Sequence, residues 1–207
     1  MSSDRWERLV SSVYDPFLWL GERRGMRDRR AALLRAARGR TLEIGAGTGL
    51  NLPHYPSDVD ELLLTEPSPA MASSLHRRVS GVGRPATVLT VPATELPVED
   101  SSVDTVVSTL VLCTVPDASA ALAEIARVLR PGGHFLFCEH ILSDRQVLAA
   151  AQRRLARPWA AFAIGCRCDR PLLDTITSTL RLDRVEHSTW RGMPPLVRPL
   201  ITGSAVR

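Results

Sequence analysis

Short apolar runs alternate with longer amphipathic stretches through the first two thirds of the chain. The runs have the length of buried strands, and they cover Thr41 to Ile44, Val59 to Thr65, Ala86 to Val91, Val103 to Thr109, and His134 to Cys138. Helical spacing of apolar residues follows over residues 69–82 and 119–129, and the second stretch ends in Arg-Pro-Gly-Gly. Strands that alternate with helices predict a parallel sheet with right-handed crossover connections.

Two further helical patterns precede this alternating region. Helices are predicted over residues 4–13 and 22–37. Tyr14, Asp15 and Pro16 interrupt the pattern between them, and the apolar residues 17–20 that follow are expected to be exposed.

More elements are predicted after the fifth strand. One helical face carries Leu148, Ala151, Leu155, Trp159 and Phe162. Pro158 is expected to kink or divide this helix. A helix over residues 170–180 and strands over residues 182–187 and 201–206 complete the pattern.

Length and composition indicate one globular domain. The 207 residues are 44% hydrophobic, 23% charged and 5% aromatic, unlike those of a disordered or fibrous protein. No run approaches the roughly 18 apolar residues of a membrane-spanning helix, and no secretory signal pattern is seen. The four cysteines lack zinc-finger spacing, so we expect a cytoplasmic protein without a disulfide framework. Peripheral contact with a membrane stays open.

The basic residues are all arginines, and their excess lies in one stretch. Between Gly21 and Arg40, eight arginines accompany only Glu22 and Asp28, whereas the whole chain has a net charge of +4. Such a stretch can attract an anionic partner, but a solvated helix face beside a core stripe is the simpler interpretation. Nucleic acid is not the expected partner, because no base-stacking aromatics are interleaved with these arginines.

Three glycines at alternate positions directly follow the first predicted strand. Gly45, Gly47 and Gly49 permit positive φ and allow backbone amides to approach a ligand. A dinucleotide fingerprint would need its third glycine at position 50, where the chain has Leu50. The spacing therefore argues against a nicotinamide oxidoreductase.

An acidic residue closes the second predicted strand. Glu66 lies 17 residues beyond Gly49, where a carboxylate can accept bonds from both hydroxyls of a ribose. The glycines and Glu66 together indicate a nucleoside site without a pyrophosphate. The alternative is a tight structural turn beside an exposed strand end.

Ordered motifs along the chain resemble those of the class I S-adenosylmethionine-dependent methyltransferases. They are Glu43-x-Gly45-x-Gly47-x-Gly49, Glu66-Pro67, Ala93-Thr94-Glu95-Leu96-Pro97, Val103-Asp104-Thr105-Val106-Val107 and Arg127-Val128-Leu129-Arg130-Pro131-Gly132-Gly133. The resemblance implies a single α/β domain over residues 1–207. Its fold would be Rossmann-like and doubly wound, with a mostly parallel seven-stranded sheet of order 3-2-1-4-5-7-6 and an antiparallel last strand. It also implies a helical lid at residues 1–38 and a helical acceptor-side insertion at residues 141–180.

The same resemblance implies S-adenosylmethionine as the cofactor and assigns its contacts. Around its methionine and ribose lie Glu43, Gly45, Ala46, Gly47, Thr48, Gly49 and Glu66. Around its adenine lie Pro67, Met71, Ala93, Thr94 and Glu95, and beneath the reactive methyl lie Thr109 and Leu110. Pro92 stands where many relatives have an aspartate, so Thr94 or Glu95 is expected to bind the exocyclic amine of adenine.

A narrower similarity points to the acceptor. Residues 109–113, Glu139-His140, Gly165-Cys166 and residues 187–206 resemble the methyltransferase-like proteins of lipid droplets and endoplasmic reticulum that methylate small alkyl thiols. Those relatives carry an N-terminal hydrophobic anchor, which we expect this protein to lack. The similarity favours a small, lipophilic acceptor.

Catalysis of methyl transfer depends mainly on alignment, because the reaction is an in-line displacement. His140 follows the fifth strand and is expected to act as a base or to orient the acceptor. Tyr14 and Asp15 resemble a lid element, with a helix-terminating turn as the alternative. Cys166 and Cys168 lack further ligands at zinc spacing, so no metal site is expected, and they are interpreted as buried small residues or as lining of the acceptor pocket. Cys113 is interpreted as core packing or as a contact of the cofactor or the acceptor.

The sequence therefore predicts an S-adenosylmethionine-dependent methyltransferase. Its partner is expected to be a small, lipophilic acceptor, namely a thiol, an amine, a phenol or a lipid. One alternative is a catalytically idle protein that binds S-adenosylmethionine for a regulatory or interaction role. Another alternative is a protein methyltransferase. The sequence makes no prediction of the oligomeric state.

Overall fold

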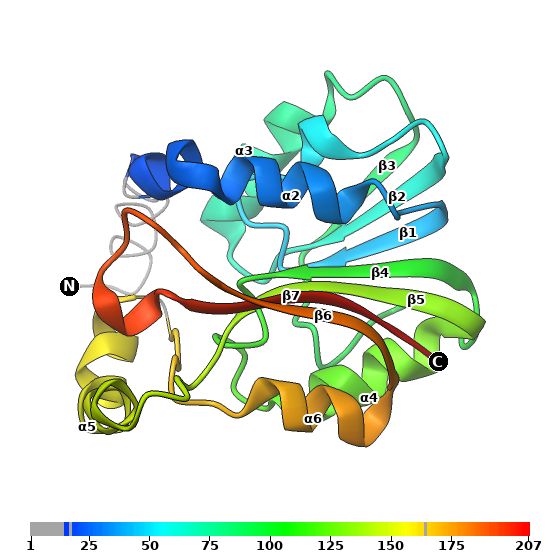
Figure 1. The fold of residues 1–207 in the computed structure, drawn as a ribbon. Coiled ribbons are helices and arrows are strands. Elements are labelled where there is room, and N and C mark those ends of the chain that lie inside the picture. The colour runs from blue at the N-terminus through cyan, green and yellow to red at the C-terminus, as the bar shows by residue number, and fades with distance from the viewer. Residues whose placement is uncertain (1–14, 17, 164) are drawn as a thin grey trace.

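The computed structural model describes residues 15, 16, 18–163 and 165–207, which form a seven-stranded sheet with helices on both faces (Figure 1). The helix predicted over residues 4–13 and the candidate lid residue Tyr14 lie outside the described residues. The α/β, Rossmann-like fold class is confirmed.

The order of the strands in the sheet is β3-β2-β1-β4-β5-β7-β6. Their bounds are β1 Gly39–Ile44, β2 Val59–Thr65, β3 Ala86–Leu89, β4 Val103–Thr109, β5 Leu129–His140, β6 Arg181–Thr189 and β7 Pro199–Val206. The first five strands pair in parallel, whereas β7 is antiparallel to both β5 and β6. The predicted strand order and the antiparallel last strand are confirmed.

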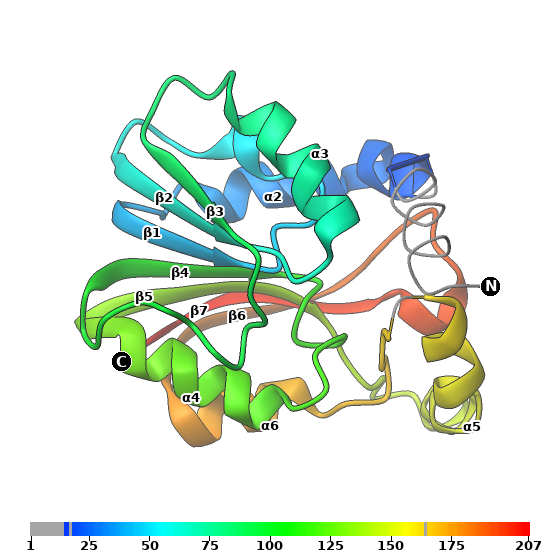
Figure 2. The same ribbon diagram turned by 180° about the vertical axis from the view of Figure 1, so that it is seen from behind.

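The helices form two layers around the sheet. Their bounds are η1 Glu22–Met26, α2 Arg27–Leu34, η2 Leu52–His54, α3 Pro69–Val79, α4 Ala118–Val128, α5 Gln146–Phe162, α6 Leu172–Thr179 and η3 Pro195–Val197. Figures 1 and 2 show α2 and α3 over one face of the sheet and α4 and α6 over the other. Within the described ranges, no helix combines the length and apolarity needed to cross a bilayer.

The central strands are buried because helices cover both faces of the sheet. Leu42 and Ile44 in β1 and Val106 and Val107 in β4 have no exposed surface. Parallel strands covered on both faces appear in a sequence as continuous apolar runs, which is why these strands were predictable. The carboxyl ends of the parallel strands meet at one edge of the sheet, and the loops that leave this edge carry the predicted site.

The structure corrects the helix predicted over residues 22–37. Arg24 and Gly25 have non-helical dihedral angles, and Gly25 has a φ of 114°. A right-handed helix cannot continue through a positive φ, so a separate turn, η1, precedes α2, which ends at Leu34. The apolar residues before η1 were all predicted to be exposed. The structure confirms this for Trp19 and Leu20, whereas Leu18 is buried.

The structure also corrects two expectations in the second half of the chain. Pro158 does not divide its helix, since α5 runs continuously through it to Phe162. Pro158 removes one hydrogen bond to the carbonyl of Arg154, and both residues are exposed, so water can bond to that carbonyl. The Arg-Pro-Gly-Gly segment belongs to β5 rather than to a helix end, and a register shift between Val103 and Thr105 in β4 accommodates it.

Candidate active site

The loop between β1 and η2 is closed on one side and open on the other. A Cβ on Gly45 would lie 2.7 Å from the side chain of Val111, so the backbone packs closely there. A Cβ on Gly47 would meet no atom within 4 Å, although Gly47 has a φ of +58° that favours glycine. The open side at Gly47 leaves room for a ligand to contact the backbone.

Glu66 is held against this loop. Its Oε2 accepts a hydrogen bond of 2.9 Å from the N–H of Gly47, and its Oε1 accepts one of 2.9 Å from the N–H of Ser68. Burial raises the pKa of Glu66, and the two N–H donors partly oppose this rise. The structure thus brings together the glycine loop and the acid that were predicted to share a nucleoside.

Glu43 lies in a buried polar network beneath the loop. Its carboxylate accepts hydrogen bonds of 2.8 Å from Asn51 Nδ2 and 2.7 Å from the hydroxyl of Tyr55. Burial raises the pKa of Glu43 to about 7, against the effect of these donors and of Arg30. Glu43 is therefore tied to protein groups within the site.

Arg30 joins this network from α2, although the arginine-rich stretch was interpreted as a solvated face. Its Nη1 donates to Asn51 Oδ1 at 3.0 Å and to Thr109 Oγ1 at 2.9 Å, and its Nε donates to Glu22 at 3.1 Å. Only 4% of Arg30 is exposed. Arg30, Asn51 and Tyr55 were not singled out from the sequence, because only their tertiary contacts distinguish them from the other polar residues of the chain. One weak signal was present, since Asn51 is the only asparagine in the chain.

The predicted lid residue Asp15 lies at the glycine loop. Its Oδ1 accepts a hydrogen bond of 2.6 Å from Thr48 Oγ1, and Arg78 Nη2 forms an ion pair of 2.5 Å with its Oδ2. Thr48 is one of the predicted cofactor-binding residues. The contact connects the N-terminal segment to the loop, as a lid over this site requires.

The residues predicted to surround adenine lie on two neighbouring segments. Met71 is buried in the first turn of α3, and Ala93 is buried in the loop after β3. Thr94 is half-buried, whereas Pro67 and Glu95 are exposed. The N–H of Leu96 donates to Glu124 at 2.9 Å and holds the Ala93 loop on α4.

The end of β4 is shaped by a carboxylate on the neighbouring strand. Leu110 has a φ of +62°, and its N–H donates to the carbonyl of Cys138 at 2.8 Å. The fully buried Glu139 accepts hydrogen bonds from Ser108 Oγ at 2.6 Å and from the N–H of Val111 at 3.0 Å. Burial raises the pKa of Glu139, and these donors oppose the rise. Glu139 positions the segment that follows Thr109, a role that was not predicted.

His140 is buried at the end of β5, and its ring stacks on that of Trp190 with 5.5 Å between centroids. Burial lowers the pKa of His140 to about 4, so the imidazole is neutral near pH 7. A base of such low pKa removes a proton weakly at that pH. Its Nδ1 is buried and finds no hydrogen-bond partner among the described residues.

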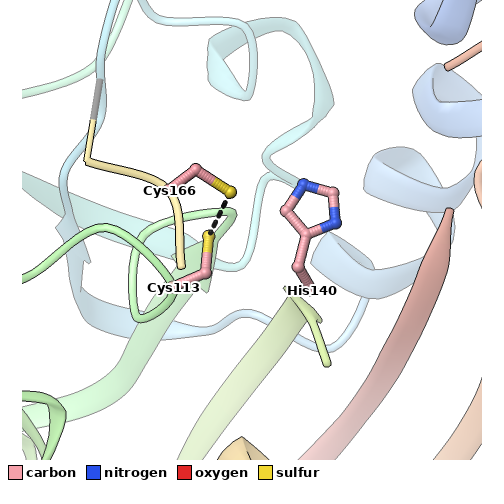
Figure 3. A group of neighbouring side chains, drawn as sticks. All are labelled: Cys113, His140 and Cys166. Carbon is pink, nitrogen blue, oxygen red and sulfur yellow. Dashed lines mark hydrogen bonds between the residues drawn. The ribbon is translucent and has the colours of Figure 1, made fainter. Parts of the chain in front are cut away.

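Two cysteines lie beside His140, as Figure 3 shows. The sulfur atoms of Cys113 and Cys166 are 3.9 Å apart, and a ring nitrogen of His140 lies within 4.8 Å of both. The thiol–thiol hydrogen bond lowers the pKa of Cys166, whereas that bond and burial raise the pKa of Cys113. Sequence spacing did not indicate this cluster, because its members come from three separate loops and strand ends.

Comparisons with known proteins agree with this arrangement. A family model described as a methyltransferase domain matches residues 42–137. The chain is 34% identical to a phosphatidylethanolamine N-methyltransferase of Cereibacter sphaeroides over 164 residues, which are 78% of this chain and 79% of that protein. It is 32% identical to the thiol S-methyltransferase TMT1A of Homo sapiens over 175 residues, 80% of this chain and 70% of that protein. A solved methyltransferase of Thermotoga maritima has a TM-score of 0.68 at 21% identity and covers 96% of this chain and 97% of its own.

The site also fits S-adenosylmethionine on structural grounds. The open side of Gly47 suits a ligand that contacts the backbone, and the Glu66 carboxylate beside it suits the ribose hydroxyls of a nucleoside. The loop lacks the third glycine that a pyrophosphate fingerprint would need. With the fold, the site and the relatives in agreement, the chain belongs to the class I S-adenosylmethionine-dependent methyltransferases.

Proposed function

We propose that this methyltransferase acts on a small, lipophilic acceptor and that an alkyl thiol is its preferred acceptor class. The observation that carries the proposal is the scarcity of general bases beside the segment after β4 in the part of the chain that the structure describes. Glu139 is occupied by its own hydrogen-bond donors, and His140 has a pKa of about 4. An acceptor that ionises by itself suits such a site best.

Acceptor classes differ in how much help they need to lose a proton. A thiol has an ordinary pKa near ~8.5 and is partly ionised at neutral pH, whereas a phenol or an alkylamine, with pKa near ~10, needs a base. The relatives include both a thiol S-methyltransferase and a phosphatidylethanolamine N-methyltransferase. The poor supply of bases favours the thiol.

The lipophilic character of the acceptor is supported by apolar side chains near the same edge of the sheet. The helix α5 follows the carboxyl end of β5, and its Leu155 and Phe162 are 42% and 61% exposed. In the N-terminal segment, Trp19 is 55% exposed and the guanidinium of Arg23 lies 4.9 Å from its ring centroid. Exposed apolar side chains flanked by arginines are suited to a lipophilic substrate or to peripheral contact with a membrane.

The residues of the site position the reactants for an in-line displacement. S-adenosylmethionine supplies a methyl group on a positively charged sulfur, which leaves without needing a proton. The glycine loop and Glu66 hold the nucleoside end, and Asp15 closes the N-terminal segment onto Thr48. The turn at Leu110, held by Glu139, keeps the apolar segment after β4 against the loop, where it would help to exclude water from a bound acceptor.

The test is an acceptor panel with a methyl-tritiated donor. Octanethiol, octylamine, octanol, a phenol and phosphatidylethanolamine vesicles are compared at equal concentration, and products are separated by extraction. We expect label in the alkyl sulfide above all, and no label with Glu66→Ala. Label confined to the amine or lipid would overturn the choice of thiol. Label in the protein fraction would indicate a protein methyltransferase, and binding of S-adenosylhomocysteine without turnover would indicate an idle binding protein.

A further inference from the structure

The cluster of Cys113, His140 and Cys166 has the composition of a zinc site. Two cysteines and a histidine are a ligand set found in catalytic zinc sites, which keep a fourth position open. The three side chains reach the cluster from the exit of β4, the end of β5 and the loop after α5 (Figure 3). All three are buried, with 1%, 5% and 6% of Cys113, His140 and Cys166 exposed.

The separation of the two sulfurs matches tetrahedral coordination. Bonds of about 2.3 Å from zinc to sulfur and about 2.05 Å to nitrogen require about 3.8 Å between two sulfurs and about 3.6 Å from sulfur to nitrogen. The sulfur atoms of Cys113 and Cys166 already stand 3.9 Å apart. A ring nitrogen of His140 lies within 4.8 Å of both sulfurs, so it is placed to be the third ligand beside the two thiols.

Contacts outside the cluster hold the ligands in place. The N–H of Arg167, next to Cys166, donates to the carbonyl of Cys113 at 2.7 Å. The side chain of Arg170 donates to the carbonyl of Leu112 at 2.8 Å. These two hydrogen bonds hold the loop after α5 against the segment after β4, and they keep the two sulfurs close to each other. Anchored ligands are what a site needs in order to select a metal.

Charge balance favours a divalent cation in this position. Two thiolates and a neutral imidazole carry a charge of about −2, which a Zn²⁺ ion cancels. A neutral site can be buried without the large cost of an isolated charge. We therefore propose that Cys113 Sγ, Cys166 Sγ and a ring nitrogen of His140 bind one Zn²⁺ ion and leave its fourth position open to an exogenous ligand.

The open position has a consequence for the acceptor, which rests on the proposed function. A thiol that coordinates Zn²⁺ is deprotonated, and its proton passes to water. Cys113 lies in the segment that follows Thr109, and His140 ends the neighbouring strand β5, so the cluster adjoins the predicted place of the reactive methyl. Zinc in this place would present a thiolate to the methyl group and would offset the scarcity of general bases.

The first experiment measures metal binding alone, without donor or acceptor. The full chain is purified under a thiol-free reductant, loaded with Zn²⁺, desalted and analysed by plasma mass spectrometry. We expect roughly one zinc ion per chain in the wild type and less than roughly a tenth in Cys113→Ser and Cys166→Ser. Cys168→Ser is the matched control, because Cys168 is also buried in the loop after α5 but lies outside the cluster. It should keep the wild-type stoichiometry.

A second measurement does not depend on the variants folding. The wild type loaded with Co²⁺ should show sulfur-to-cobalt charge transfer and the visible bands of tetrahedral cobalt. Added octanethiol should change those bands if the fourth position takes the acceptor. If the cobalt bands appear but do not change with any thiol, the metal site is confirmed and its proposed role in binding the acceptor is rejected.

Three outcomes would overturn the metal site. The wild type would bind no Zn²⁺ although its thiols titrate as reduced, or Cys168→Ser would lose zinc as Cys113→Ser does. The third is a Cys113–Cys166 disulfide that forms in place of metal binding, which would make the cluster a redox pair. Since S-adenosylhomocysteine binding is measured on the same samples, failure of the zinc site is distinguishable from failure of the methyltransferase function.

Discussion

The main-chain N–H of Gly47 donates a hydrogen bond of 2.9 Å to Oε2 of Glu66, joining the loop after β1 to the end of β2. These are neighbouring strands, and their carboxyl ends meet at the edge of the sheet. The bond sets the carboxylate beside the open side of Gly47. The relationship is the reason we expect the loop and the acid to bind the cofactor together, and it can be tested from either residue.

Replacement of the acid should weaken cofactor binding. Glu66→Ala removes hydrogen bonds between a charged group and the ribose, so the affinity for S-adenosylhomocysteine should fall roughly 10- to 100-fold. Titration calorimetry measures this directly. Glu61→Gln is the control, because Glu61 lies on β2, the strand that Glu66 directly follows, but pairs with Arg40 away from the site. Equal affinity of Glu66→Ala and the wild type would reject the assigned site.

Replacement of the glycine should separate strain from ligand contact. Gly47→Ala and Gly83→Ala both place a Cβ on a backbone with positive φ, +58° and +69°, and neither Cβ meets an atom within 4 Å. Each should lower the free energy of unfolding by about 1 to 2 kcal/mol. Only Gly47→Ala should also lower the affinity for S-adenosylhomocysteine, by roughly tenfold or more. An equal loss of affinity in the two variants would show that the effect is indirect.

The buried arginine should contribute strongly to stability. Arg30→Met leaves Asn51 Oδ1 without its donor, removes one of the two donors to Thr109 Oγ1 and deprives Glu22 of its ion-pair partner. We expect a loss of about 2 to 4 kcal/mol in the free energy of unfolding by urea. Arg27→Met, at an exposed position of the same helix, should change it by less than about 0.5 kcal/mol. Similar losses in both variants would contradict the network.

Stability should depend on pH through Glu43. Its pKa rises from 4.5 to about 7 in the folded chain because the carboxyl group is buried. Between these values the folded state keeps a proton that the unfolded state has lost, so stability falls as pH rises through this window and levels off above pH 7.

Urea unfolding at pH 5 and pH 7.5 tests this sign. Glu43→Gln cannot lose the proton, so the wild type should lose more stability than the variant between the two pH values, by roughly 3 kcal/mol at most. A wild type that gains stability relative to Glu43→Gln over this range would mean that the buried carboxyl is ionised throughout.

Much of the fold followed from local patterns. The predicted strand at Val59 to Thr65 has the bounds of β2, and that at Val103 to Thr109 has the bounds of β4. Helices cover both faces of these strands, so nearly every position is buried and the sequence shows a continuous apolar run. Helix ends were less predictable, because Gly25 breaks one helix while exposed Pro158 leaves another intact.

The candidate site likewise contains features that the sequence predicted and features that it did not. Glycines that need positive φ and an acid at a strand end are local features, and the structure places them together as the spacing indicated. Glu139 was noticed only as part of a resemblance, because its partners, Ser108 Oγ and the N–H of Val111, lie 31 and 28 positions earlier in the chain. No local pattern reports such a bond.

By itself the sequence determined most of the strands and the glycine loop after the first of them, because hydrophobic periodicity and glycine geometry are properties of a few neighbouring residues. The strand order and the cofactor were expected from the resemblance of the ordered motifs to a family. Only the tertiary structure decided that Arg30 is buried against Asn51 and Thr109, and that Cys113 and Cys166 face each other beside His140. These groups are far apart along the chain, and they meet because the sheet gathers the ends of its strands at one edge. Their chemistry arises from proximity, and a linear pattern carries no record of which distant residues become neighbours.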